Sequence, residues 1–158
     1  MSEQAPDLTM QLQSKPNLLS SVRSMILSLT QRVGFDETEC GHIALAIDEA
    51  LANIIRHGYD HRDDEPIHIA LWILRDDTPG IRIMIEDEAK QIDPDSIKGR
   101  DLEDVKPGGL GVHIMREIMD SCRFECRKQE KGMRVIMEKH LGTKQAGQSE
   151  LPQSPQAK

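Results

Sequence analysis

The chain has 158 residues, of which 37% are hydrophobic, 30% charged and 3% aromatic, and its net charge is −7. These values predict one globular domain with a core of Ile, Leu, Val and Met. The acidic balance argues against binding of nucleic acid through its phosphates. No apolar run approaches the roughly 20 residues that a membrane helix requires, and the first residues do not resemble a signal peptide.

The predicted elements begin with a strand over residues 8–14, where apolar and polar residues alternate. A helix is expected from Pro16 to Gly34, because proline suits the first turn of a helix and glycine its end. A second helix is expected from Asp36 to Gly58. Apolar residues at helical spacing form its core stripe: Ile43, Ile47, Leu51, Ile54 and Ile55.

The second half of the chain contains two predicted strand pairs. Residues 67–74 are apolar on both faces, which indicates a central strand, and a turn leads to a returning strand at 81–85. Residues 88–107 show no period, and a loop of this length within a compact domain is usually functional or mobile. The remaining expected elements are a helix at 109–120 and strands at 122–126 and 133–137.

This order of elements predicts an α+β fold, a two-layer sandwich with helices on one face of a mixed, mainly antiparallel sheet. The folded domain is expected over residues 8–141. Residues 1–7 are expected to be a flexible N-terminus, and residues 142–158 a disordered tail of Gln, Ser, Pro and Ala.

The three cysteines are Cys40, Cys122 and Cys126. Their odd number and the absence of CxxC spacing argue against a disulfide framework and against a structural zinc site. Free thiols are typical of a reducing cytoplasm, so we expect a cytoplasmic protein. Each cysteine is expected to act as a small buried hydrophobe.

Glu49 and Asn53 lie one helical turn apart and away from the core stripe. One interpretation is a solvated helix face. The other is a site, because Ala46 and Ala50 flank the pair and would let a ligand approach the helix closely. Asn53 would then supply an oxygen to Mg²⁺, and Glu49 would accept a proton from an attacking hydroxyl.

Asp87 ends the strand that begins at residue 81. An acid at a strand end is common and can be structural only. At the floor of a pocket, its carboxylate would accept the exocyclic N–H of adenine, whereas guanine presents a carbonyl at that position. The residue would then select adenine.

Gly108, Gly109 and Gly111 end the long charged loop and open an apolar helix. They can be a flexible entrance to that helix. Alternatively, the free N–H groups and the dipole of the helix start would bind phosphate oxygens. Three basic residues of the loop could reach the same oxygens or simply be solvated: Lys98, Arg100 and Lys106.

Three segments resemble the GHKL ATPase/kinase superfamily, and within it the bacterial anti-sigma-factor serine kinases. Residues 44–59 (ALAIDEALANIIRHGY) resemble the N-box, residues 87–94 the G1 box and residues 108–115 (GGLGVHIM) the G2 box. Their order and spacing agree over residues 8–140. The resemblance implies the Bergerat fold of histidine-kinase-like ATPases, with ATP and Mg²⁺ covered by a lid at about 93–108.

The resemblance also implies a role for each motif residue. Asn53 would chelate Mg²⁺, and Glu49 would be the base or activator. Asp87 would bind adenine, with Gly109 and Gly111 near the phosphates. Members of the family phosphorylate a serine on a small anti-anti-sigma (STAS-type) partner and also bind a sigma factor, often as homodimers.

The chain departs from the family pattern at three positions. Ala89 and Gln91 occupy the places of the G1 glycines, and Met133 follows Gly132 where the family often has Thr or Asn. Ala89 would border the nucleotide with one added methyl, glutamine adds more bulk, and methionine cannot offer the hydrogen bond of Thr or Asn to the adenine site.

The sequence therefore predicts an ATP-dependent serine protein kinase that acts by partner switching. A second hypothesis is a non-catalytic adaptor that holds a nucleotide, or none, and sequesters a regulator. A third is the catalytic domain of a histidine kinase, which would need a phosphoacceptor helix hairpin that the sequence does not show.

Overall fold

The computed structural model describes residues 4–97, 109–129 and 131–142. The part of the predicted lid after residue 97, and the predicted tail from residue 143, lie outside the described residues. In chain order the elements are β1 (Leu8–Gln13), η1 (Pro16–Leu18), α1 (Leu19–Val33), α2 (Glu37–Asn53), η2 (Ile54–Gly58), β2 (Pro66–Leu74), β3 (Gly80–Glu86), η3 (Pro94–Ser96), α3 (Leu110–Ile118), β4 (Ser121–Cys126) and β5 (Met133–His140).

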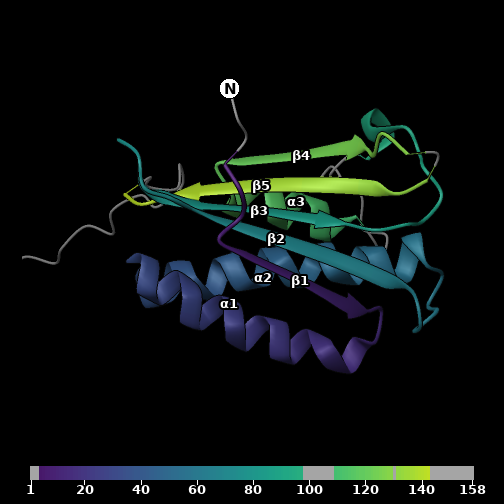
Figure 1. The fold of residues 1–158 in the computed structure, drawn as a ribbon, viewed down its shortest axis with the longest axis horizontal. Helices are drawn as coiled ribbons and strands as arrows, with labels where there is room; N and C mark the ends of the chain where they lie inside the picture. Colours follow the sequence, from purple (N-terminus) through teal and green to yellow (C-terminus); the bar gives the residue numbers. More distant parts are fainter. Residues whose placement is uncertain (1–3, 98–108, 130, 143–158) are drawn as a thin grey trace, which may run out of the picture.

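The strands form one sheet in the order β1-β2-β3-β5-β4, and β2 is an interior strand, as its apolar faces predicted. Each neighbouring pair of these described strands is antiparallel, so the expected mixed sheet has no parallel pair here. The reason is topological. The crossover through α3 makes β4 run parallel to β3, but β5 lies between these two strands (Figure 1).

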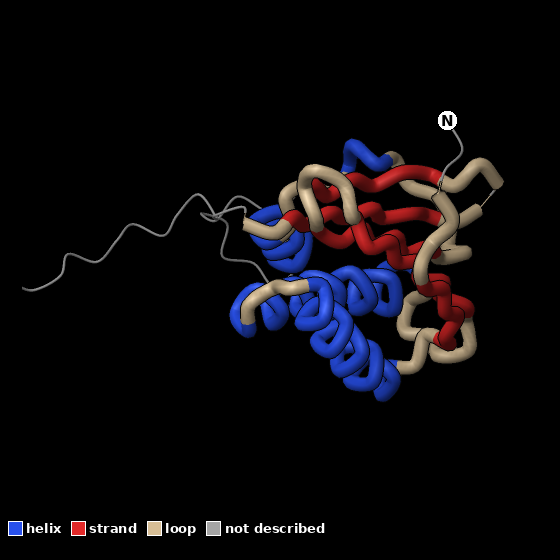
Figure 2. Tube along the Cα trace, turned by 60° about the vertical axis from the view of Figure 1, so that its left-hand side comes forward, coloured by secondary structure: helices blue, strands red, loops and turns tan. Residues whose placement is uncertain are grey.

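The helices cover one face of the sheet, as the predicted two-layer α+β sandwich requires (Figures 1 and 2). The core stripe of α2 packs here, and Ile43, Ile47 and Leu51 are fully buried. Alternate residues of β2 and β3 face these helices, because side chains alternate across a strand. In these two strands the fully buried residues are Ile67, Ile69, Leu71, Ile81, Ile83 and Ile85.

Helix α2 begins and ends at recognisable sequence signals. Asp36 accepts a hydrogen bond from the Glu39 amide, and the Glu39 carboxylate accepts one from the Asp36 amide, which forms a capping box. The predicted helix does continue to Gly58, but its last turn, η2, is a π-helix. Such wide turns recur at functional sites.

Residues 4–7 belong to the segment that was expected to be flexible. In the structure the Trp72 indole donates a hydrogen bond to the Gln4 carbonyl, and Asp7 accepts hydrogen bonds from the Ile73 amide and from Arg75.

Within the described ranges, no helix combines the length and apolar character needed to cross a bilayer. Cys126 is exposed, so the expectation of burial was wrong for this cysteine.

Candidate functional site

A cavity of about 300 Å³ lies between the end of α2, the start of α3 and strands β3, β4 and β5. Its volume is at the lower end of the range for small-molecule sites. Most of its lining is apolar, and a smaller number of polar side chains also reach it. Apolar lining residues include Ile54, Ile85, Val112, Phe124, Met133 and Val135, and the polar ones are Asn53, His57, Asp87, Lys90, Ser96 and Arg134.

The structure brings together four of the predicted site residues around this cavity. Asn53 comes from α2, Asp87 and Ala89 from the end of β3, and Gly109 from the start of α3. These positions are far apart in sequence and adjacent here because α2 and α3 pack on the same face of the sheet. Four further predicted contacts lie outside the described residues: Lys98, Arg100, Lys106 and Gly108. The remaining two, Glu49 and Gly111, are described but do not line the cavity.

Glu49 lies beside the cavity, where α2 meets the start of α3. A Cβ atom added to Gly111 would lie 2.5 Å from Glu49 Oε2 and 3.5 Å from Asn53 Nδ2. The missing side chain at Gly111 therefore lets the first turn of α3 approach both polar side chains of the N-box. The three residues form one contact, with an acid and an amide next to the N-terminus of a helix.

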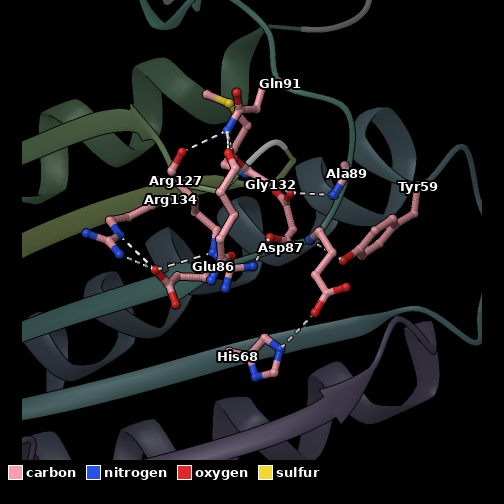
Figure 3. Close-up of polar contacts among 12 residues, drawn as sticks. Tyr59, His68, Glu86, Asp87, Ala89, Gln91, Arg127, Gly132 and Arg134 are labelled. Atoms are coloured by element: carbon pink, nitrogen blue, oxygen red, sulfur yellow. Dashed lines mark hydrogen bonds and ion pairs between the residues drawn. The ribbon is translucent and has the colours of Figure 1, made fainter.

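Asp87 is 5% exposed, and its two carboxylate oxygens have different surroundings. Oδ1 accepts hydrogen bonds from the Ala89 amide (2.8 Å) and from the Met133 amide (3.0 Å) (Figure 3). No hydrogen bond from a described residue reaches Oδ2, so Oδ2 remains available as an acceptor. Burial raises the pKa of this carboxyl, and the two amides oppose that shift.

The three departures from the family pattern have different consequences. Ala89 is buried, and its Cβ would lie 3.2 Å from a Cβ on Gly58, so its methyl fits because Gly58 has no side chain. Gln91 is not among the cavity residues, so its bulk does not reduce the space. Met133 contributes an amide to Asp87, but its side chain lines the cavity without offering a hydroxyl or amide.

The sequence reasoning missed three basic residues that line the cavity, namely His57, Lys90 and Arg134. His57 lies in the π-turn. It follows Asn53 by four residues, and this spacing could have indicated a shared face. For Lys90 and Arg134 the sequence offers no signal, because their position depends on how β3 and β5 pair.

The residues present fit a magnesium nucleotide on three grounds. The Gly111 backbone leaves a cradle that a Cβ would fill, Asp87 Oδ2 has no described hydrogen-bond donor, and the paired Glu49 and Asn53 carry the oxygen donors that Mg²⁺ prefers. The apolar lining would suit a flat heterocyclic base.

The fold and this site define a nucleotide-binding α+β domain, and comparison with known families identifies its class. The family model for the histidine kinase-like ATPase domain matches residues 12–139, and the chain belongs to this family. Two curated relatives are similar over nearly the whole chain. Serine-protein kinase RsbW of Listeria monocytogenes serotype 4a (strain HCC23) is 27% identical over 144 residues, covering 87% of this chain and 89% of the relative.

Serine-protein kinase RsbW of Bacillus subtilis (strain 168) is 25% identical over 150 residues, covering 89% of each chain. A solved structure, of the RsbU and RsbW domains of Rv1364c from Mycobacterium tuberculosis, matches with a TM-score of 0.58 at 18% identity. The match covers 86% of this chain and about a third (33%) of that one. At this identity it supports the shared fold alone.

Proposed function

We propose that the chain is an ATP-dependent serine protein kinase that phosphorylates a small anti-anti-sigma (STAS-type) protein. The carrying observation is the contact of Glu49, Asn53 and Gly111 beside a cavity that contains Asp87. The family assignment supports the use of ATP, and the names of the relatives support a serine as acceptor.

In this proposal each residue has one task. Asp87 Oδ2 accepts the amino proton of adenine, and the amides at the start of α3 receive phosphate oxygens. Asn53 holds Mg²⁺, which when bound neutralises phosphate charge. Glu49 accepts the proton of the serine hydroxyl, since phosphoryl transfer depends mainly on positioning and charge neutralisation.

The partners and setting are part of the same proposal. The kinase would switch between its STAS-type substrate and a sigma factor, act as a homodimer and work in the cytoplasm. The domain would span residues 8–141, with a lid over about 93–108 that brings Lys98, Arg100 and Lys106 to the phosphates.

The test is phosphorylation of a purified STAS-type partner with Mg²⁺ and radiolabelled ATP. We expect Glu49→Gln to lower the labelling rate by roughly 10²–10⁴-fold, because a general base contributes about that much. Glu37→Gln is the matched control, since Glu37 lies at the other end of α2. An unchanged rate in Glu49→Gln would refute the assigned base.

A non-catalytic adaptor remains the second candidate, favoured by one observation. Met133 offers only its amide near Asp87, where a hydroxyl or amide side chain would add a hydrogen bond to the base. Calorimetry with Mg·ATP separates the candidates. Tight binding without transfer to any STAS-type protein would indicate a nucleotide-gated adaptor, and no binding would indicate a nucleotide-free one.

A further inference from the structure

Gln91 connects the segment after β3 to the turn between β4 and β5. Its Nε2 lies 2.9 Å from the Arg127 carbonyl, 2.9 Å from the Gln129 carbonyl and 3.2 Å from the Gly132 carbonyl (Figure 3). Two amide hydrogens thus serve three main-chain acceptors of one turn, with the longest contact shared.

The orientation of this amide follows from its surroundings. A side-chain amide has one end with two donors and one end that only accepts. Three carbonyl oxygens surround the Nε2 position of Gln91. If the amide were flipped, its oxygen would face these three oxygens, and none of the four atoms could donate a hydrogen bond. Only the NH₂ end satisfies the site, and this requirement distinguishes glutamine from glutamate, which has the same shape.

The turn to which Gln91 is hydrogen-bonded leads into Met133, which lines the cavity beside Asp87, where adenine is proposed to bind. The Gly132 amide donates to the Ala89 carbonyl at 2.7 Å, and the next amide, of Met133, donates to Asp87 Oδ1 at 3.0 Å. Gly132 has φ +96°, and a Cβ there would lie 2.3 Å from the Asp87 carbonyl. The segment after β3 and the β4–β5 turn therefore touch at Asp87 and Gly132, and Gln91 joins them again a few residues further along. With both contacts in place, the two segments have little freedom to move apart.

We propose that Gln91 is a positioning residue that fixes Asp87 and the Met133 amide in the arrangement that receives the base, before any nucleotide enters. This inference rests on the proposed nucleotide binding. Glycine, which the resembled family usually has at this position, has no side chain to form these bonds. Here the Gln91 side chain bonds the segment after β3 to the β4–β5 turn. The segment is therefore already ordered before nucleotide binding, and less conformational entropy is lost when the nucleotide binds.

The first measurement is calorimetric binding of Mg·ATP and of inorganic tripolyphosphate to the full chain. We expect Gln91→Ala and Gln91→Glu to raise the Kd for ATP about fivefold to tenfold, as for one lost hydrogen bond, and to leave the Kd for tripolyphosphate unchanged. Gln129→Ala is the control, because its carbonyl is retained. Equal ATP affinity in wild type and both Gln91 variants would overturn the inference while leaving nucleotide binding intact.

The second measurement needs no nucleotide. Amide hydrogen exchange should become faster at Gly132 and Met133 in Gln91→Ala and Gln91→Glu, and stay unchanged on α1. Unchanged exchange at both amides would refute the positioning role even if the chain binds no ATP, and a failure of wild type to bind ATP would refute the proposed function instead. If Gln91→Glu behaves like wild type in both measurements, the inference is overturned, because the carboxylate has the shape of the amide but cannot donate these hydrogen bonds.

Discussion

Asp87 is a buried carboxylate that burial disfavours in its charged form. Only Oδ1 of this carboxylate receives hydrogen bonds from the described residues. Burial raises its pKa above the ordinary value of 3.8, so the charged form is disfavoured by its surroundings. An acceptor kept poorly solvated gains more from a donor supplied by a ligand than an exposed one would.

Asp87→Asn is expected to weaken ATP binding without weakening the fold. The amide keeps an acceptor for the Ala89 and Met133 amides but removes the charge, so ATP affinity should fall by about 1.5–3 kcal/mol. The free energy of unfolding without ligand should stay equal or rise at pH 7. Calorimetry and urea unfolding measure the two effects, with Asp77→Asn, on the exposed β2–β3 turn, as the control.

The pH dependence of this stability has a definite sign. The native pKa of Asp87 lies above the unfolded one, so the native state binds more protons in that range. Its contribution to the free energy of unfolding therefore falls as pH rises from about 4 through the native pKa. The Asp87→Asn variant should lack this fall. Parallel pH profiles for wild type and variant would contradict the assignment.

At the scale of elements, the end of the η2 turn is joined to the end of β3 by one buried phenol. The Tyr59 hydroxyl donates to the Pro66 carbonyl and accepts from the Glu88 amide at 2.7 Å. Burial raises the pKa of Tyr59 to about 12. The residue after Asp87 is therefore held by the segment that follows Asn53, which connects two parts of the candidate site.

Tyr59→Phe should destabilise the protein by about 1–3 kcal/mol, because the Pro66 carbonyl and the Glu88 amide both lose their hydrogen bond to the phenol. Urea unfolding measures this loss, and hydrogen exchange at the Glu88 amide localises it. In wild type the contribution of the neutral phenol should be lost as pH rises from about 10 to about 12, since its native pKa is raised. A variant as stable as wild type at pH 7 would show that the bridge contributes nothing.

At the scale of the whole molecule, the cavity lies where the sheet, the end of α2 and the start of α3 meet. Residues of β3, β4 and β5 line it from the sheet, while residues of α2 and the start of α3 line it from the helical layer. A ligand placed there would contact elements from both layers. Binding would consequently stabilise the fold as a unit, and not one loop alone.

Saturating Mg·ATP should therefore raise the thermal midpoint. At a ligand concentration of about 100 times Kd, linkage adds about 2.7 kcal/mol, which corresponds to roughly 5–10 °C for a domain of this size. Scanning calorimetry with and without Mg·ATP measures the shift, and Asp87→Asn at the same ATP concentration should show a smaller one. A midpoint independent of ATP would exclude binding at this cavity.

The sequence by itself determined the elements, the two layers and the motif positions, because these depend on local periodicity, caps and turn residues. The spacing of Ile43, Ile47 and Leu51 identified the buried face of α2, and the alternation in residues 81–85 identified β3. These signals lie within a few residues of one another, so they can be read without knowing which segments meet.

Tertiary structure alone decided which distant groups touch. The insertion of β5 between β3 and β4 removes the expected parallel pair and brings Met133 to Asp87. The same pairing sets the three carbonyls that Gln91 bonds and adds Lys90 and Arg134 to the cavity. Such contacts depend on strand order and on the packing of α3 against α2, which no local pattern encodes.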